Sequence, residues 1–127
     1  MTVSLQRQSR GQQAHAAGVA AEEIVARQYQ AKGCGVLETR WRGPGGEIDL
    51  IVQDGPYVVF VEVKKSRSFD AAAVRLGPRQ IERLCASAAA YLGTLPAGSL
   101  TEARFDVALV NGSGMVRILP NAFGVDG

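Results

Sequence analysis

The pattern of apolar and polar positions along the chain predicts two helices. Residues 14–32 are rich in alanine and contain no proline, and Gly33 follows them as a helix C-terminal glycine does. A second helix is expected over residues 78–93, because Gly77-Pro78 places a proline near its first position and Gly93 ends it. The apolar residues of this second segment recur at helical spacing on one face: Ile81, Leu84, Cys85, Ala88 and Leu92.

Short runs of β-branched and apolar residues predict strands between and after these helices. The runs are residues 36–41, 47–53, 57–64, 104–110 and 115–119. The turn signal Asp54-Gly55-Pro56 joins the second and third runs, so these two should form an antiparallel hairpin. Loops are expected over the glycine-rich stretch 42–46, the polar stretch 65–76 and the turn 111–114.

The order of these elements predicts the fold class. The helix at 78–93 is expected to be a crossover between the strands at 57–64 and 104–110, right-handed if these strands are parallel neighbours. We therefore predict an α/β fold, in which helices flank a mixed sheet made of an antiparallel meander and a parallel crossover strand. One domain should span residues 14–127, preceded by a flexible arm over residues 1–13, which are rich in Gln, Ser and Arg.

Composition narrows the class of protein further. At 127 residues, of which 46% are hydrophobic, the chain has the size and apolar content of one domain with a core. No apolar run approaches the roughly 20 residues of a membrane span, and the first residues lack a secretory pattern, so we expect a cytoplasmic protein without membrane contact. Two cysteines and one histidine are too few for a structural zinc site. The net charge of +2 permits a polyanionic partner without requiring one.

The most informative feature is a pair of charges inside an otherwise apolar strand. Glu62 and Lys64 lie two positions apart in the run 57–64, so their side chains share one face. The same run has valine and phenylalanine on both faces, which indicates a buried strand. An ionised group in such a strand is costly unless it is paired or binds a metal. Both charges therefore need a partner.

Asp49, on the other strand of the hairpin, is the candidate partner. A four-residue loop over residues 54–57 places Asp49 directly opposite Glu62, whereas a two-residue loop at 54–55 places Asp49 diagonally on the same face. A three-residue loop would put Asp49 on the opposite face instead. The sequence leaves these registers open.

Two converging carboxylates repel each other unless a cation lies between them. Mg²⁺ binds a few carboxylate oxygens, keeps several waters and accepts phosphate oxygens, so Asp49 and Glu62 are typical of a metal-dependent nuclease. Lys64 would then orient the attacking water or stabilise the negative charge that develops on phosphorus. The alternative is a structural ion pair in which Lys64 neutralises one of the carboxylates, with no metal and no catalysis.

The motifs that contain these residues resemble a known family. The stretches Gly46-Glu47-Ile48-Asp49-Leu50-Ile51, residues 59–64 (VFVEVK) and residues 104–107 (RFDV) resemble the YraN family of bacterial proteins over roughly residues 18–123. That resemblance implies a restriction-endonuclease-like core similar in layout to archaeal Holliday-junction resolvases. It implies catalytic roles for Asp49, Glu62 and Lys64, and Mg²⁺ or Mn²⁺ bound at Asp49, Glu62 and Val63.

The resemblance also points to Glu22, although the family's glycine before this glutamate is replaced by Ala21. Helical spacing with Val25 and Tyr29 favours an inward-facing Glu22, but the helix is apolar almost all round, and its membership of the site stays open. Glu23 is expected to form an ordinary exposed bridge with Arg27, four residues on.

Two further matches to the family lie outside the carboxylate site. Arg79 stands where the family usually has lysine, and it either contacts a phosphate or is a solvated charge at the start of a helix. Asp106 is interpreted as a structural partner for a nearby arginine and is left outside the site.

Basic and aromatic residues offer a surface for nucleic acid. We predict phosphate contacts from Arg42, Lys65, Arg67 and Arg79, and stacking of a base on Trp41, with Arg40, Arg75 and Arg83 as further cations. Each of these is alternatively a solvated surface residue, and no motif for sequence-specific base readout is present.

The sequence thus favours a metal-dependent nuclease acting on DNA, branched or damaged DNA included. A nucleic-acid-binding protein without turnover and a protein–protein adaptor with the same fold are the alternatives. Cutting both strands of a junction would require a homodimer, for which the sequence gives no surface.

Overall fold

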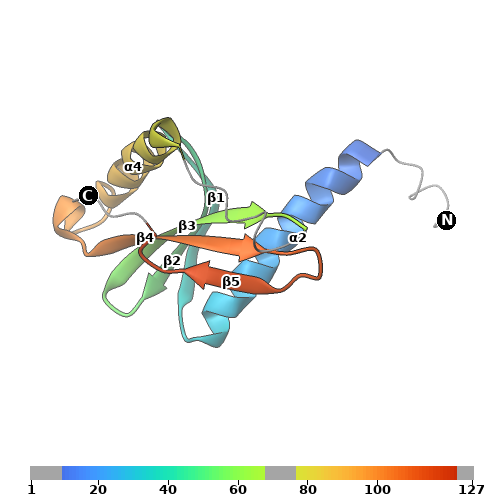
Figure 1. The fold of residues 1–127 in the computed structure, drawn as a ribbon. Helices are drawn as coiled ribbons and strands as arrows, with labels where there is room; N and C mark the ends of the chain where they lie inside the picture. Colours follow the sequence, from blue (N-terminus) through green and yellow to red (C-terminus); the bar gives the residue numbers. More distant parts are fainter. Residues whose placement is uncertain (1–9, 68–76, 123–127) are drawn as a thin grey trace.

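The computed structural model describes the backbone of residues 10–67 and 77–122, and side chains from residue 20 onward (Figure 1). Its helices are α2 (Arg10–Ala31), α4 (Pro78–Leu92) and the short 3₁₀ helix η1 (Gly98–Leu100). Its strands are β1 (Gly35–Gly43), β2 (Gly46–Asp54), β3 (Tyr57–Lys65), β4 (Ala103–Val110) and β5 (Val116–Leu119). The predicted elements are therefore confirmed in type and in order.

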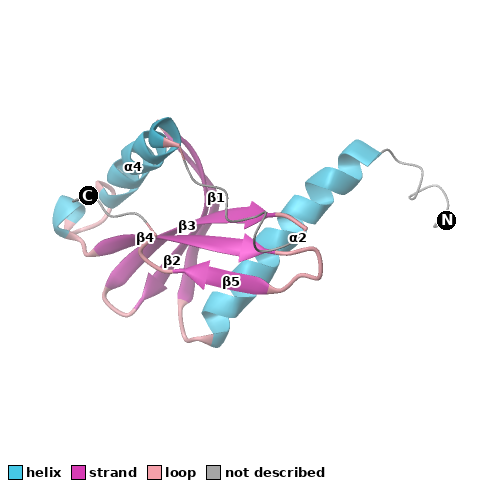
Figure 2. Cartoon of the chain, in the orientation of Figure 1, coloured by secondary structure: helices cyan, strands magenta, loops and turns pink. Residues whose placement is uncertain are grey.

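The strands form a single mixed sheet in the order β1-β2-β3-β4-β5 (Figure 2). The β1–β2, β2–β3 and β4–β5 pairs are antiparallel, whereas β3 and β4 are parallel and lie on either side of α4 in the chain. The meander and the parallel crossover strand are thus confirmed. This α/β arrangement is the one expected of a restriction-endonuclease-like core.

The two long helices pack on opposite faces of the sheet. Tyr29 and Val25 of α2 join one core cluster with Leu50, Val59 and Ala108, all of them buried. The other face carries a second cluster around α4, with buried Leu84, Ala88, Tyr91, Ile51 and Phe60. Because β2 and β3 are apolar on both faces, they are covered from both sides and form the centre of the domain. Figure 1 shows α2 extending beyond the strands.

Ser87 on α4 fixes the position of the β1–β2 turn. Its hydroxyl accepts a hydrogen bond from the Gly45 N–H at 2.9 Å and donates one to the Gly46 carbonyl at 2.8 Å. A side chain at position 45 would collide with the backbone of Arg83, so only glycine allows this close approach. The turn that leads into β2 is therefore held against α4.

Some predicted boundaries are wrong. Helix α2 begins at Arg10 rather than at residue 14, so residues 10–13 are helical; residues 1–9 of the predicted arm lie outside the described residues. Residues 42–46 are not all loop, since β1 continues through Gly43 and β2 starts at Gly46 across a two-residue turn. Strand β3 includes Lys65, and residues 68–76 of the expected loop, with Arg75, lie outside the described residues.

Candidate functional site

The hairpin register brings Asp49 level with Glu62. The connecting loop has two residues, Gly55 and Pro56, and regular pairing runs from Asp54 opposite Tyr57 to Leu50 opposite Val61. The regular pairing ends there, one step before Asp49 and Glu62, and the side chains of these two residues interact beyond it. The register is the one expected from a four-residue loop at 54–57. The observed loop is shorter only because Asp54 and Tyr57, its two end residues, also pair with each other.

Beyond the end of the backbone pairing between β2 and β3, the side chain of Asp49 accepts a hydrogen bond from β3. The Val63 N–H donates to Asp49 Oδ2 at 2.8 Å, beyond the last regular pair of β2 and β3. The carboxylate is thereby fixed beside the segment of β3 that carries Glu62 and Lys64.

Glu62 has charged and polar partners on three sides. Its side chain is only 12% exposed, and Lys64 Nζ lies 3.5 Å from Glu62 Oε2. Gln80 on α4 donates from Nε2 to the same oxygen at 2.8 Å. Burial, then the charge of Asp49 and a hydrogen bond with it, raise the pKa of Glu62 from 4.5 to about 7, against the opposing effect of Lys64. Near neutral pH, Glu62 is therefore poised between its protonated and ionised forms.

The donor set fits a divalent cation. Asp49 and Glu62 place two carboxyl groups within hydrogen-bonding contact, and the lysine beside them does not suffice to hold both ionised at neutral pH. Among the described residues, no group of three or more His, Cys, Asp or Glu side chains could hold a metal by itself. A cation here would complete its shell with backbone oxygen, water or a ligand's phosphate, which is how Mg²⁺ is usually bound.

Gln80 is a site residue that the sequence reasoning missed. It lies in the first turn of α4, next to Arg79, and reaches across to β3. The available signal was a polar residue, Gln80, directly before Ile81. Ile81 belongs to the apolar face of a helix that was expected to cover the sheet. That signal does not indicate which strand residue the amide meets.

Glu22 approaches the same cluster from α2. Its side chain is half-buried, and its pKa is raised by burial, then by the charges of Asp49 and Glu47, while Arg40 lowers it. It lines a hollow of about 230 Å³ with Glu23, Ala26, Thr39 and Arg40. Its neighbour Glu23 forms the expected exposed bridge with Arg27, at 3.7 Å.

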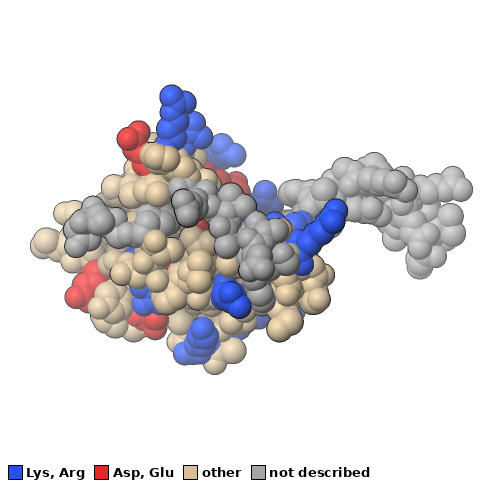
Figure 3. Space-filling model, viewed as in Figure 1, with Lys and Arg blue, Asp and Glu red and all other residues tan. Residues whose placement is uncertain are grey.

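The predicted phosphate contacts are exposed, but the predicted stacking residue is not fully so. Arg42, Lys65, Arg67 and Arg79 lie at the surface. The ring of Trp41 is half-buried and packs edge-on against Tyr91, with 5.2 Å between the ring centroids. This packing gives Trp41 a structural role that does not require a bound base. On the face drawn in Figure 3, basic side chains stand in separate groups, one of them over α4.

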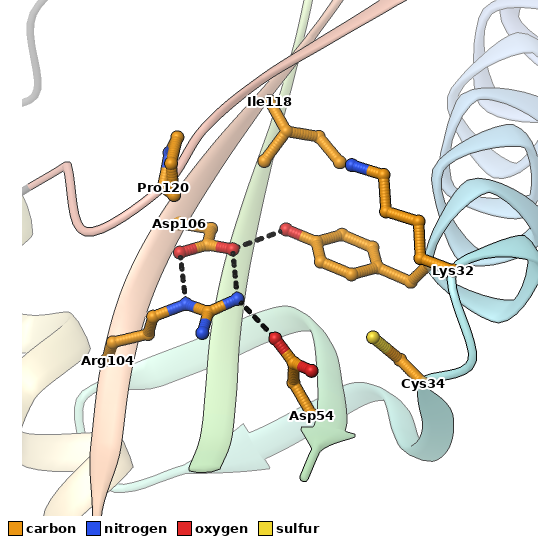
Figure 4. A pocket seen from close by; sticks show the side chains of 8 residues that line it. Lys32, Cys34, Asp54, Arg104, Asp106, Ile118 and Pro120 are labelled. Atoms are coloured by element: carbon orange, nitrogen blue, oxygen red, sulfur yellow. Dashed lines mark hydrogen bonds and ion pairs between the residues drawn. The ribbon is translucent and has the colours of Figure 1, made fainter.

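Asp106 belongs to a separate structural network, as expected. Its buried carboxylate accepts hydrogen bonds from Arg104 Nε at 3.1 Å, from the Tyr29 hydroxyl at 2.7 Å and from the Asn121 N–H at 3.0 Å. Figure 4 shows Arg104 between Asp106 and Asp54, which lies 2.9 Å away. Burial and the bond to Asp106 raise the pKa of Tyr29. This network joins α2 to the sheet, and Arg104 pairs with both of its carboxylates.

Comparisons with known proteins agree with the resemblance drawn from the motifs. The model of the uncharacterised protein family UPF0102 matches residues 21–110. A UPF0102 protein of Ruegeria sp. is 54% identical over 116 residues, covering 91% of this chain and 94% of the relative. One of Ruegeria pomeroyi is 55% identical with the same coverage, and one of Cereibacter sphaeroides is 53% identical over 89% and 97% of the two chains. None of the helices in the described part of the chain is long and apolar enough to cross a membrane.

Proposed function

The chain belongs to the uncharacterised protein family UPF0102, and from this membership and the geometry of Asp49 and Glu62 we propose that it is a metal-dependent nuclease acting on DNA. The observation that carries the proposal is the contact between these two carboxyl groups on a buried hairpin, where burial and then Asp49 raise the pKa of Glu62 to about 7. A purely structural ion pair with Lys64 would need only one carboxylate. The second acid makes the pair costly without a further cation.

In this proposal Asp49, Glu62 and a backbone oxygen at Val63 hold Mg²⁺ or Mn²⁺. When bound, the cation would polarise the phosphoryl group and lower the pKa of the attacking water. Lys64, with its side chain 30% exposed, orients that water or stabilises the charge that develops on phosphorus. Gln80 holds Glu62 in place through its 2.8 Å hydrogen bond. Glu22 on α2 interacts electrostatically with Asp49 and adds a third carboxyl group beside the proposed site.

The proposed substrate is DNA, branched or damaged DNA included. Support comes from the exposed cations Arg42, Lys65, Arg67 and Arg79 and from the resemblance to the YraN family, which implies a layout similar to that of junction resolvases. Contacts of this kind hold the phosphate backbone without reading sequence. Cleavage of both strands of a junction would require a homodimer.

The metal is tested by titrating Mg²⁺ and Mn²⁺ into the protein by calorimetry, once alone and once with DNA. The Asp49→Asn/Glu62→Gln double variant should lose binding. Glu23→Gln is the matched control, since Glu23 is exposed and bridges only to Arg27, so it should bind as the unchanged protein does. Equal binding by the double variant would refute the metal site.

Cleavage is tested on branched, single-stranded and duplex DNA with Mn²⁺. Glu62→Gln should lower the rate by about 10²-fold or more, because it removes a proposed metal ligand, and Glu23→Gln should not. Unchanged cleavage in Asp49→Asn and Glu62→Gln would exclude this mechanism. A nucleic-acid-binding protein without turnover would instead bind DNA equally well in chelator, with affinity that falls steeply with salt.

A further inference from the structure

Arg40 on β1 has a backbone conformation that is unusual for its residue type. Its φ is +51°, in the left-handed region, where among the described non-glycine residues only Asn121 also lies. Asparagine adopts this region readily, whereas a long side chain such as arginine does so seldom. Such a residue persists where the surrounding structure requires it, and these residues cluster at functional sites.

The unusual residue lies directly across from Asp49. The pairing of β1 with β2 passes from Thr39 opposite Leu50 to Trp41 opposite Ile48 and omits Arg40 and Asp49 between them. On the other side of β2, regular pairing with β3 stops at Leu50. Asp49 is thus outside both ladders, although it lies within the central part of the sheet.

Strand β2 changes face at the same point. In a regular strand, residues two apart point to one face, so Ile48 and Leu50 should share their surroundings. Instead Leu50 packs in the core cluster under α2, and Ile48 packs in the cluster under α4. On β1, Trp41 packs with the α4 cluster beside Ile48. The change of face on β2 therefore coincides with the left-handed residue on β1.

We infer that Arg40 is a positioning residue whose left-handed backbone turns Asp49 out of the sheet ladder and sets its carboxylate against Val63 and Glu62. The backbone, rather than the charge, carries this role. The guanidinium makes a half-exposed ion pair with Glu47, at 3.4 Å, and such pairs contribute little to stability. Its charge also lowers the pKa of Glu22. The inference deepens the proposed function, since it explains how the metal-binding carboxylate is oriented.

Two substitutions separate backbone from charge, since both remove the cation. Arg40→Asn keeps a residue suited to the left-handed region, and Arg40→Val introduces a β-branched residue that is not. Thr39→Val is the matched control for valine on β1, because Thr39 is exposed and pairs regularly with Leu50. The first measurement is hydrogen exchange of the Val63 amide in metal-free protein, which reports the bond to Asp49 directly. The second is the Kd for Mn²⁺.

Arg40→Asn and Thr39→Val should keep the Val63 amide protected and the Mn²⁺ Kd within about twofold of the unchanged protein. Arg40→Val should expose that amide and weaken Mn²⁺ binding at least tenfold, while the Val59 and Val61 amides stay protected. Equal exchange in Arg40→Asn and Arg40→Val would overturn the inference. If Arg40→Val does not fold, Arg40→Gly and Arg40→Ala make the same comparison, because glycine adopts the left-handed region freely and alanine does not. The loss of stability should be smaller for alanine than for valine. Absence of Mn²⁺ binding in the unchanged protein would refute the metal proposal, and the Val63 exchange would still decide the role of Arg40.

Discussion

Replacing Glu62 with glutamine should change how the stability of the metal-free protein depends on pH. Burial and Asp49 raise the pKa of Glu62 from 4.5 to about 7 in the folded state. The folded protein therefore holds this proton more tightly than the unfolded chain does. The resulting stabilisation is fully present below pH 4.5 and is lost as the pH rises through about 7.

The size of the effect follows from the pKa shift. Each pKa unit corresponds to about 1.4 kcal/mol, so the shift of Glu62 amounts to about 3 kcal/mol. Its side chain is 12% exposed, so solvent screens this cost only slightly. The stability of Glu62→Gln, measured relative to the unchanged protein, should rise by about this amount between pH 4.5 and pH 8. For a domain of this size that is roughly 10 °C in Tm.

Urea denaturation at several pH values between 4.5 and 8.5, in chelator and at constant ionic strength, measures this difference. Glu23→Gln is the control, because its carboxylate is exposed and its curve should run parallel to that of the unchanged protein. Asp49→Asn should flatten the dependence only in part, since burial, the larger cause of the raised pKa of Glu62, remains in this variant. Parallel curves for Glu62→Gln and the unchanged protein would refute the argument that burial and Asp49 hold Glu62 protonated.

Three further substitutions test the packing around the site by urea denaturation. Ser87→Ala removes a buried hydroxyl that bonds to Gly45 and should cost about 2 kcal/mol; a loss below about 0.5 kcal/mol would show that the β1–β2 turn does not depend on it. Arg104→Met leaves the buried Asp106 carboxylate without its cation and should cost about 3–5 kcal/mol. The Arg104→Met/Asp106→Asn double variant, which removes the buried charge but keeps an acceptor for the Tyr29 hydroxyl, should recover part of that loss. Tyr29→Phe removes one of the bonds to Asp106 and should cost about 1–2 kcal/mol; an unchanged midpoint would contradict that.

Several features of the fold were determined by local sequence. The Asp54-Gly55-Pro56 turn and the flanking apolar runs specify an antiparallel hairpin, although its register, left open by the sequence, was decided by the observed two-residue loop at Gly55 and Pro56. Gly77-Pro78 and the helical spacing after it specify α4 as the crossover between parallel strands. These features depend on backbone torsion and on the two-residue and 3.6-residue periods, which the sequence displays directly. The charges at 49, 62 and 64 were visible for the same reason, as polar residues inside apolar strands.

Other features were decided only by tertiary structure. The pKa of Glu62 depends on its burial in the folded protein, then on Asp49 and Lys64. The hydrogen bond that Glu62 accepts from Gln80 depends on where α4 packs. The half-burial of Trp41 against Tyr91 likewise depends on how α4 meets β1. The change of face at Asp49 breaks the alternation on which strand prediction relies. Arg40, to which we attribute this change, carries no sequence signal for a left-handed backbone. Periodic patterns determine which faces are apolar, whereas burial depth and neighbours from other elements follow only once those faces have packed.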